Sequence, residues 1–263
     1  MQKPLRSTDP EFGALLEKAL RKRQRRAAGL NSVVQEIVQH VRDNGDPALL
    51  RYTEKFDGIS LRSRELRVSS KEIEMAVASC ELEDIAALEF AAGRIEDFHK
   101  RQIPKGFSFT DQAGLKLATR WTPIQSVGLY VPGGQAIYPS SLLMNAIPAL
   151  VAGVKRIAMI NPGKNGKLDP AVLYAAKKCK INEIYSIGGP AAIAGIAYGT
   201  KKIKKVDKIV GPGNSYVTAA KREVFGDVGI ESMIAGPSEI TVVCDKFSNA
   251  EWVASDLIGQ AEH

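Results

Sequence analysis

The spacing of hydrophobic residues divides the chain into a helical region and a later region where short strands and helices alternate. In the first region, five aliphatic residues recur at helical spacing and predict a helix: Val33, Val34, Ile37, Val38 and Val41. Asn44-Gly45 predicts the end of that helix, and Asp46-Pro47 predicts the start of the next, which ends at Asp57-Gly58. Residues up to about 60 are therefore expected to be helical.

The next segment mixes strand and helix signals. Residues 65–68 predict a short strand, and Ser69 with Glu72 forms the pattern of a capping box before a long amphipathic helix. Residues 107–121 alternate around the turn at 111–114 as a β-hairpin does.

Residues 127–131 are a short apolar run rich in β-forming residues, which predicts a buried strand. Pro132-Gly133-Gly134 breaks this strand, because proline cannot continue a central strand. Ser140 and Ser141 are placed to cap a following helix, which Pro148 interrupts or kinks. A strand, a glycine turn and a helix in this order present backbone N–H groups to which an anion such as a pyrophosphate can bind.

The same alternation continues towards the end of the chain. Single helices separate the later strands, with Asn214 capping one helix and the last helix beginning near Asn249. Strands joined by single helices pair in parallel, so the pattern predicts an α/β fold with a Rossmann-like doubly wound parallel sheet. The later strands are expected at residues 156–160, 183–187, 208–210 and 240–244.

Ligands bind such sheets beyond the carboxyl ends of the strands, which here are glycine turns. No G-x-G-x-x-G fingerprint occurs in these turns. The layout therefore allows a dinucleotide site, while the same glycines are equally compatible with plain architecture.

The composition is that of a soluble globular protein. Of the 263 residues, 44% are hydrophobic and 25% are charged, and no apolar run has the length of a membrane span. The three cysteines form no Cys-x-x-Cys pair, which argues against a thiolate zinc knuckle and fits a reducing compartment. We expect a cytoplasmic protein with no membrane partner.

The net charge of +7 brings nucleic-acid binding into consideration. The densest basic cluster, residues 21–26, lies in a helical stretch with few aromatic residues to stack on bases. A solvated helix face explains it more simply, so no nucleic-acid partner is expected. Attraction of an anionic dinucleotide explains the excess positive charge more simply than nucleic-acid binding does.

The final stretch, ASDLIGQAEH, places Gln260 and His263 one turn apart on a helix. Imidazole is a good zinc donor and a glutamine carbonyl a weak one, so the pair is half of a candidate site. The alternative is a terminal helix with two exposed polar residues. The other histidines, His40 and His99, lie in the helical region, so further ligands would come from another chain or from residues not present.

Several long motifs occur in order and together resemble the histidinol dehydrogenase family. They are GLYVPGGQAIYPSSLLMNAIPALVAGV, KVDKIVGPGNSYVTAAK, AGPSEI and VASDLIGQAEH, with the milder pattern VRDNGDPALLRYTEKFDG before them. The resemblance implies a zinc-dependent homodimer that oxidises L-histidinol through the aldehyde to L-histidine and reduces two NAD molecules.

The resemblance also implies roles for individual residues. Tyr130 and Asn214 correspond to residues that contact NAD. Ser238 corresponds to a residue that contacts substrate. Gln260 and His263 correspond to zinc ligands that lie against the substrate. One departure is Ala191, which stands where the family usually has a glutamine, so one hydrogen bond to the cofactor is expected to be missing.

Family members continue beyond this histidine, and the catalytic Glu-His pair lies in that later part, so no catalytic residue is assigned here. The resemblance divides the chain into an N-terminal helical region with the first part of an incomplete α/β domain (1–127), a complete Rossmann-like domain (128–238) and a return to the first domain (239–263). We expect the chain alone to be inactive. The alternative is a non-catalytic nucleotide-binding or subunit-interaction module derived from the family.

Overall fold

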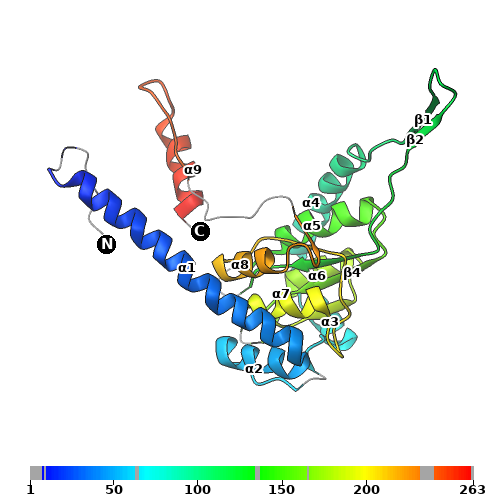
Figure 1. Ribbon diagram of the computed structural model, residues 1–263, viewed down its shortest axis with the longest axis horizontal. Helices are drawn as coiled ribbons and strands as arrows, with labels where there is room; N and C mark the ends of the chain where they lie inside the picture. Colours follow the sequence, from blue (N-terminus) through cyan, green and yellow to red (C-terminus); the bar gives the residue numbers. More distant parts are fainter. Residues whose placement is uncertain are drawn as a thin grey trace.

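A parallel sheet of five strands forms the centre of the protein, and helices cover both of its faces (Figure 1). The computed structural model describes residues 8, 10–62, 65–133, 137–164, 166–231 and 240–261, with the backbone alone for 19–28 and 259–261. The strands lie in the order β5-β4-β3-β6-β7. Their bounds are β3 Ser126–Tyr130, β4 Arg156–Ile160, β5 Glu183–Tyr185, β6 Lys208–Val210 and β7 Gly229–Ile230. The predicted α/β fold with a doubly wound parallel sheet is confirmed.

The crossover helices divide between the two faces of the sheet. α5 (Pro139–Val151) and α6 (Pro170–Lys178) pack on one face, whereas α7 (Gly189–Tyr198) and α8 (Ser215–Glu223) pack on the other. The chain therefore runs outward from β3 through β4 to β5, and then returns to place β6 on the other side of β3. This reversal creates a topological switch point between β3 and β6.

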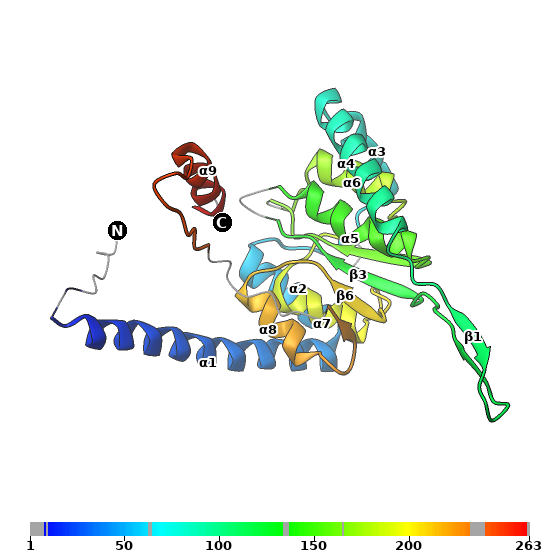
Figure 2. The ribbon, with the colours of Figure 1, turned by 90° about the horizontal axis from the view of Figure 1, so that it is seen from above.

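Four more helices form an outer layer, as Figure 2 shows from above. α1 (Phe12–Asn44) and α2 (Asp46–Asp57) pack on the side of α7 and α8. α3 (Ser70–Ala78) and α4 (Leu82–Lys100) pack on the side of α5 and α6. The N-terminal half of α1 extends away from the body of the protein (Figure 2).

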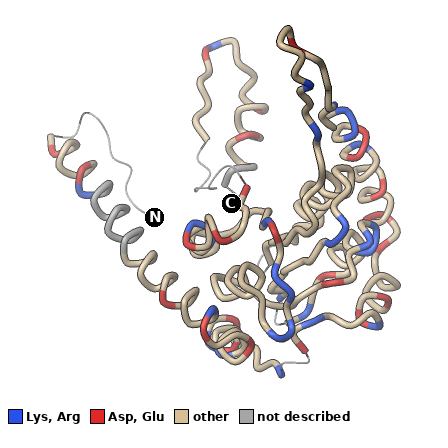
Figure 3. The backbone as a smooth tube through the Cα atoms, turned by 45° about the vertical axis from the view of Figure 1, so that its right-hand side comes forward, with Lys and Arg blue, Asp and Glu red and all other residues tan. Residues whose placement is uncertain are grey.

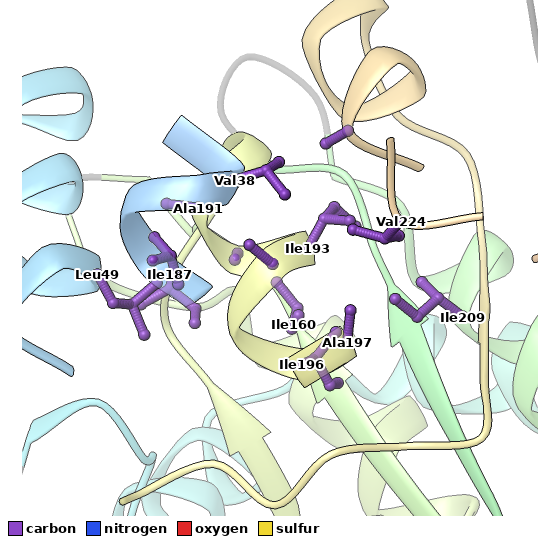
Figure 4. Close-up of a cluster of buried hydrophobic side chains, with 14 of the residues drawn as sticks. Val38, Leu49, Ile160, Ile187, Ala191, Ile193, Ile196, Ala197, Ile209 and Val224 are labelled. Carbon is purple, nitrogen blue, oxygen red and sulfur yellow. The ribbon is translucent and has the colours of Figure 1, made fainter. Parts of the chain in front are cut away.

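Each face of the sheet has its own hydrophobic core. Along β3, Leu129 points into the core under α5, while Tyr130 points into the core under α7, as the period of two along a strand requires. Figure 4 shows the core under α7, a buried cluster that contains both Val38 of α1 and Ile193 of α7. Gly128 allows α7 to approach β3 closely, because a Cβ there would lie 2.7 Å from Cδ1 of Ile196.

The predicted junction between the first two helices is confirmed. α1 ends at Asn44, and the N–H of Gly45 donates to the carbonyl of Val41 at 2.8 Å. α2 ends at Asp57, followed by Gly58 in the left-handed conformation with φ of 67°. The predicted hairpin is confirmed as β1 (Phe107–Thr110) paired antiparallel with β2 (Lys116–Thr119), and it projects from the body (Figure 2).

The prediction that Ser140 or Ser141 caps α5 is wrong. The helix begins at Pro139, before either serine, and its N-cap residue Tyr138 makes no side-chain capping bond. Proline suits this position because its fixed φ fits the first turn, where its missing N–H costs nothing. The helix also continues through Pro148 to Val151, so this proline does not interrupt it.

Two predicted strands are not strands in the structure. Residues 65–68 make only one antiparallel bridge, between Arg67 and Tyr185, at the edge of β5. Residues 240–244 form no strand, because no described strand lies beside them to pair with, and Val243 is 93% exposed. The last helix is confirmed as α9 (Ala250–Ala261), with the side chain of Asn249 accepting from the N–H of Glu251 at 2.8 Å.

Charged residues are spread over many elements, with basic and acidic side chains interspersed along most of the chain (Figure 3). Within the described residues, no helix combines the length and the apolar character needed to cross a membrane.

Candidate functional site

The candidate site is a cavity at the carboxyl ends of β3 and β6, on the topological switch point. β3 leads into Pro132 and Gly133, and β6 leads into the turn that ends at Asn214. The cavity measures about 810 Å³, and its lining includes Tyr130, Gly133, Gly189 and Asn214. α1 and α2 close its far side with Val33, Ile37, Tyr52, Phe56 and Asp57.

Gly211 brings the two strand ends together. Its φ is +109°, and a Cβ at this position would lie 2.1 Å from the carbonyl oxygen of Tyr130. Only glycine avoids this overlap. The turn is held from the other side by Lys221 of α8, whose buried ammonium donates to the carbonyl of Gly211 and to the carboxylate of Glu231. Burial lowers the pKa of Lys221, and the bond to Glu231 opposes that shift.

Tyr130 links the end of β3 to the start of α7. Its side chain is buried, and its hydroxyl oxygen accepts a hydrogen bond from the N–H of Gly189 at 3.2 Å. Desolvation raises the pKa of Tyr130 to about 12, the bond from Gly189 opposes the shift, and the charge of Asp57 adds to it. The phenol is therefore protonated at neutral pH and can donate its own hydrogen to a ligand.

α7 begins at the cavity without a side-chain cap. The first N–H groups of a helix have no partners within the helix, and the aligned peptide dipoles make this end positive. An anionic group in the cavity would accept hydrogen bonds from these N–H groups and would be attracted by the positive end of the helix.

Asn214 performs the predicted capping role. Its Oδ1 accepts from the N–H groups of Tyr216 and Val217, each at 3.1 Å. Because Oδ1 is committed to the helix, the amide nitrogen Nδ2 is the group that can donate to a ligand. Ala191 is buried and lines the same cavity.

The structure brings Tyr130, Asn214 and Ala191 together at one cavity. The other predicted site residues are not placed: Ser238 and His263 lie outside the described residues, and for Gln260 only the backbone in α9 is described. Across the part of the chain that is described, no three His, Cys, Asp or Glu side chains gather in a group that could hold a metal. His40 interacts with Tyr52 at 3.0 Å, and His99 with Gln102 at 2.6 Å.

The contributions of α1, α2 and the loop after β4 to the cavity were not predicted from the sequence. Asp57 was predicted only to end a helix, and Lys164 was not identified as a candidate, yet both line the cavity. A carboxylate in the last turn of a helix is electrostatically unfavourable. An acidic residue at this unfavourable position was the sequence feature that could have identified Asp57 as a candidate functional residue.

The doubly wound sheet and the cavity at its switch point define an α/β protein with the architecture of dinucleotide-binding enzymes. The sequence matches the family model for histidinol dehydrogenase over residues 20–263, and the chain therefore belongs to the histidinol dehydrogenase family.

Individual relatives agree with this assignment. The chain is 59% identical over 264 aligned residues to histidinol dehydrogenase from Pelagibacter ubique, covering 100% of this chain and 60% of that protein. It is 52% identical to histidinol dehydrogenase from Rhodopseudomonas palustris, and the alignment covers 99% of this chain and 61% of that protein. It also resembles the crystal structure of histidinol dehydrogenase from Elizabethkingia anophelis, with a TM-score of 0.82 and 42% identity over 89% of this chain and 54% of that one. The chain thus spans about 60% of the length of the curated relatives that it matches.

Proposed function

We propose that the protein functions in the NAD-dependent oxidation of L-histidinol, through the aldehyde, to L-histidine. Family membership supports the reaction class. Because the chain spans 60% of its Pelagibacter relative, the activity and substrate of the whole enzyme are proposals for this chain.

The observation that carries the proposal is the cavity at the switch point, where Tyr130 and Asn214 lie beside the uncapped start of α7. The described residues fit a dinucleotide. A cavity of about 810 Å³ has the size of small-molecule sites. The start of α7 suits a pyrophosphate, and Val33, Ile37 and Phe56 offer apolar surface to a ring.

When bound, NAD supplies the hydride acceptor, and the protein supplies binding and orientation. The protonated hydroxyl of Tyr130 donates from the end of β3, and Nδ2 of Asn214 donates from the start of α8. Since the N–H of Gly189 and the cap of α8 hold these two side chains, both donors are oriented before a ligand arrives. Fixed donors reduce the entropy lost on binding.

Zinc dependence belongs to the same proposal and is supported by the motif, not by geometry. Gln260 and His263 are proposed as two of the roughly four ligands that zinc requires. The described residues do not form a zinc site by themselves, so no chemical step is assigned to a metal here. We further propose that Ser238 contacts the substrate and that the full-length form is a cytoplasmic homodimer.

The test is NADH formation from L-histidinol in the presence of zinc, followed by absorbance. The assay is run with this chain and with a version extended by the remaining sequence of the Pelagibacter relative. Asn214→Ala in the extended protein is expected to lower activity by weakening NAD binding. Ser108→Ala, on the projecting strand β1, is the matched control and is expected to leave activity unchanged.

Activity in the extended protein but not in this chain alone would support the proposal and the expectation that the chain is inactive by itself. NAD binding without turnover in either version would favour the non-catalytic nucleotide-binding alternative. Absence of both would contradict the proposal.

A further inference from the structure

Asp57 is an acidic side chain in a cavity that is otherwise lined by neutral groups and one lysine, as far as the described residues show. It lies at the last position of α2 and remains accessible to solvent. It lines the same cavity as Tyr130 at the end of β3 and Gly189 at the start of α7.

The fold gains little from this carboxylate. Its helix end carries partial negative charge, which repels an anion. Desolvation raises the pKa of Asp57, so neighbouring protein has removed part of its hydration. No hydrogen bond or ion pair joins its side chain to another described residue. An acceptor that is desolvated without a partner is stabilised when a ligand supplies the donors.

The usual position for an acidic residue in a dinucleotide site is taken by a different side chain. In the common fingerprint, an Asp or Glu after the second strand accepts hydrogen bonds from the adenosine ribose. Here the second strand in chain order is β4, and Asn161 follows it. Asn161 is buried, its Oδ1 accepts from the N–H of Gly163 at 2.7 Å, and its Nδ2 donates to the carbonyl of Pro132 at 3.3 Å. Because its side-chain amide already forms these two hydrogen bonds to neighbouring loops, Asn161 does not take the role of the ribose-binding acidic residue.

Charge is divided across the cavity in a way that fits a dinucleotide. Lys164 and the positive end of α7 lie on the side of the sheet, where an anionic pyrophosphate is favoured. Asp57 lies on the side of α2, where hydroxyl donors are favoured. In a dinucleotide the ribose hydroxyls follow directly after the pyrophosphate. A pyrophosphate beside Lys164 and the start of α7 would therefore have its ribose hydroxyls next along the ligand, where Asp57 can accept from them.

We propose that Asp57 replaces the usual acidic residue after the second strand, accepts hydrogen bonds from the ribose hydroxyls of the bound dinucleotide, and selects NAD over NADP. The inference rests on the proposed function, because it deepens the description of the same cofactor site. A 2′-phosphate would bring negative charge against the carboxylate, which disfavours NADP. Asp57 is a binding and specificity residue and does not take part in the chemical step.

The experiment is calorimetric titration of the protein with NAD and with NADP, for the wild type and for Asp57→Asn. The asparagine keeps the size of the side chain and removes its charge. We expect NAD to bind about tenfold more weakly to the variant, as for loss of a hydrogen bond to a charged group. NADP affinity should stay the same or increase, so the preference for NAD should fall by tenfold or more.

Two further variants keep the test decisive. Glu54→Gln removes an exposed charge from the same helix and should leave both affinities unchanged. Asp57→Glu restores the carboxylate and should recover the preference for NAD. Thermal unfolding of each variant verifies that it is folded.

Unchanged NAD affinity and unchanged preference in folded Asp57→Asn would overturn this assignment and leave the proposed function intact. Failure of the wild-type protein to bind either dinucleotide would overturn the cofactor part of the proposed function and this assignment with it.

Discussion

The hydroxyl of Tyr130 accepts a hydrogen bond from the backbone N–H of Gly189 at 3.2 Å, and this contact joins the end of β3 to the first residue of α7. The bond orients the phenol towards the cavity and satisfies one of the N–H groups that a helix start leaves without a partner. The stability of the fold and the proposed binding of NAD thus both depend on the hydroxyl oxygen of Tyr130.

Tyr130→Phe should therefore weaken both folding and NAD binding. Removing the acceptor leaves the N–H of Gly189 without its partner in a half-buried place, which costs about 1–3 kcal/mol of unfolding free energy. NAD affinity should fall by about fivefold to tenfold through loss of one donor. Denaturant unfolding and calorimetric titration measure the two effects.

Tyr174→Phe is the matched control for that variant. Its hydroxyl donates to Glu89 at 2.8 Å, between α6 and α4 and away from the cavity. It should reduce stability slightly and leave NAD affinity unchanged. Equal losses of affinity in both variants would show that Tyr130 acts only through general stability.

Gly211→Ala should be strongly destabilising. The new Cβ would overlap the carbonyl of Tyr130, and φ of +109° is a conformation that alanine avoids. The strand ends at the switch point must then separate, at a cost of more than about 2 kcal/mol. Gly93→Ala is the contrasting variant, because a Cβ on this exposed residue of α4 meets nothing within 4 Å. It should stabilise the protein by about 0.5–1 kcal/mol. Denaturant unfolding of both variants checks the difference in sign.

The sheet and the strand-end part of the site could be predicted from local sequence. Short β-forming runs separated by single helices imply a parallel sheet, and parallel strands share one carboxyl edge, so Tyr130 and Asn214 were both expected at that edge. The capping role of Asn214 followed from its position before a helix.

The other wall of the cavity could not be predicted in this way. Ile37, Phe56 and Asp57 reach the site because α1 and α2 pack against α7, and helical periodicity says which face is apolar but not where that face docks. The strand predicted at residues 240–244 fails for a related reason. Its β-forming residues need a neighbouring strand, and pairing is a tertiary property that a local pattern does not contain.

Glu183 should make stability depend on pH in acid. Desolvation raises its pKa, but the hydrogen bonds from Arg156 and Tyr185 outweigh this and hold the pKa below its usual value. A carboxyl group whose pKa is lower in the folded state stabilises the fold when ionised. This contribution is present above the ordinary pKa of about 4.3, and is lost as pH falls through the lowered value.

Glu183→Gln should therefore lower the unfolding free energy by about 1–3 kcal/mol at neutral pH, with a smaller difference from wild type in acid. Unfolding free energies measured from neutral to acidic pH check this. Glu96→Gln, which breaks the exposed pair with Lys100, is the control and should change stability little at any pH. A difference between Glu183→Gln and wild type that does not shrink in acid would contradict the assignment.

Ala191→Gln should strengthen NAD binding. Ala191 lines the cavity in the first turn of α7, and the resemblance to the family implies a glutamine at this position. A glutamine can donate to or accept from the cofactor, and one added hydrogen bond is worth about 1 kcal/mol, or roughly fivefold in affinity. Ala191→Leu supplies similar bulk without the amide and should bring no gain, so titration of both variants separates hydrogen bonding from filling of the cavity. Because the substitution enlarges a buried position, thermal unfolding must accompany the titration. Tighter binding by a folded glutamine variant would mean that an amide at this position contacts the cofactor, whereas equal affinity would contradict the expected gain.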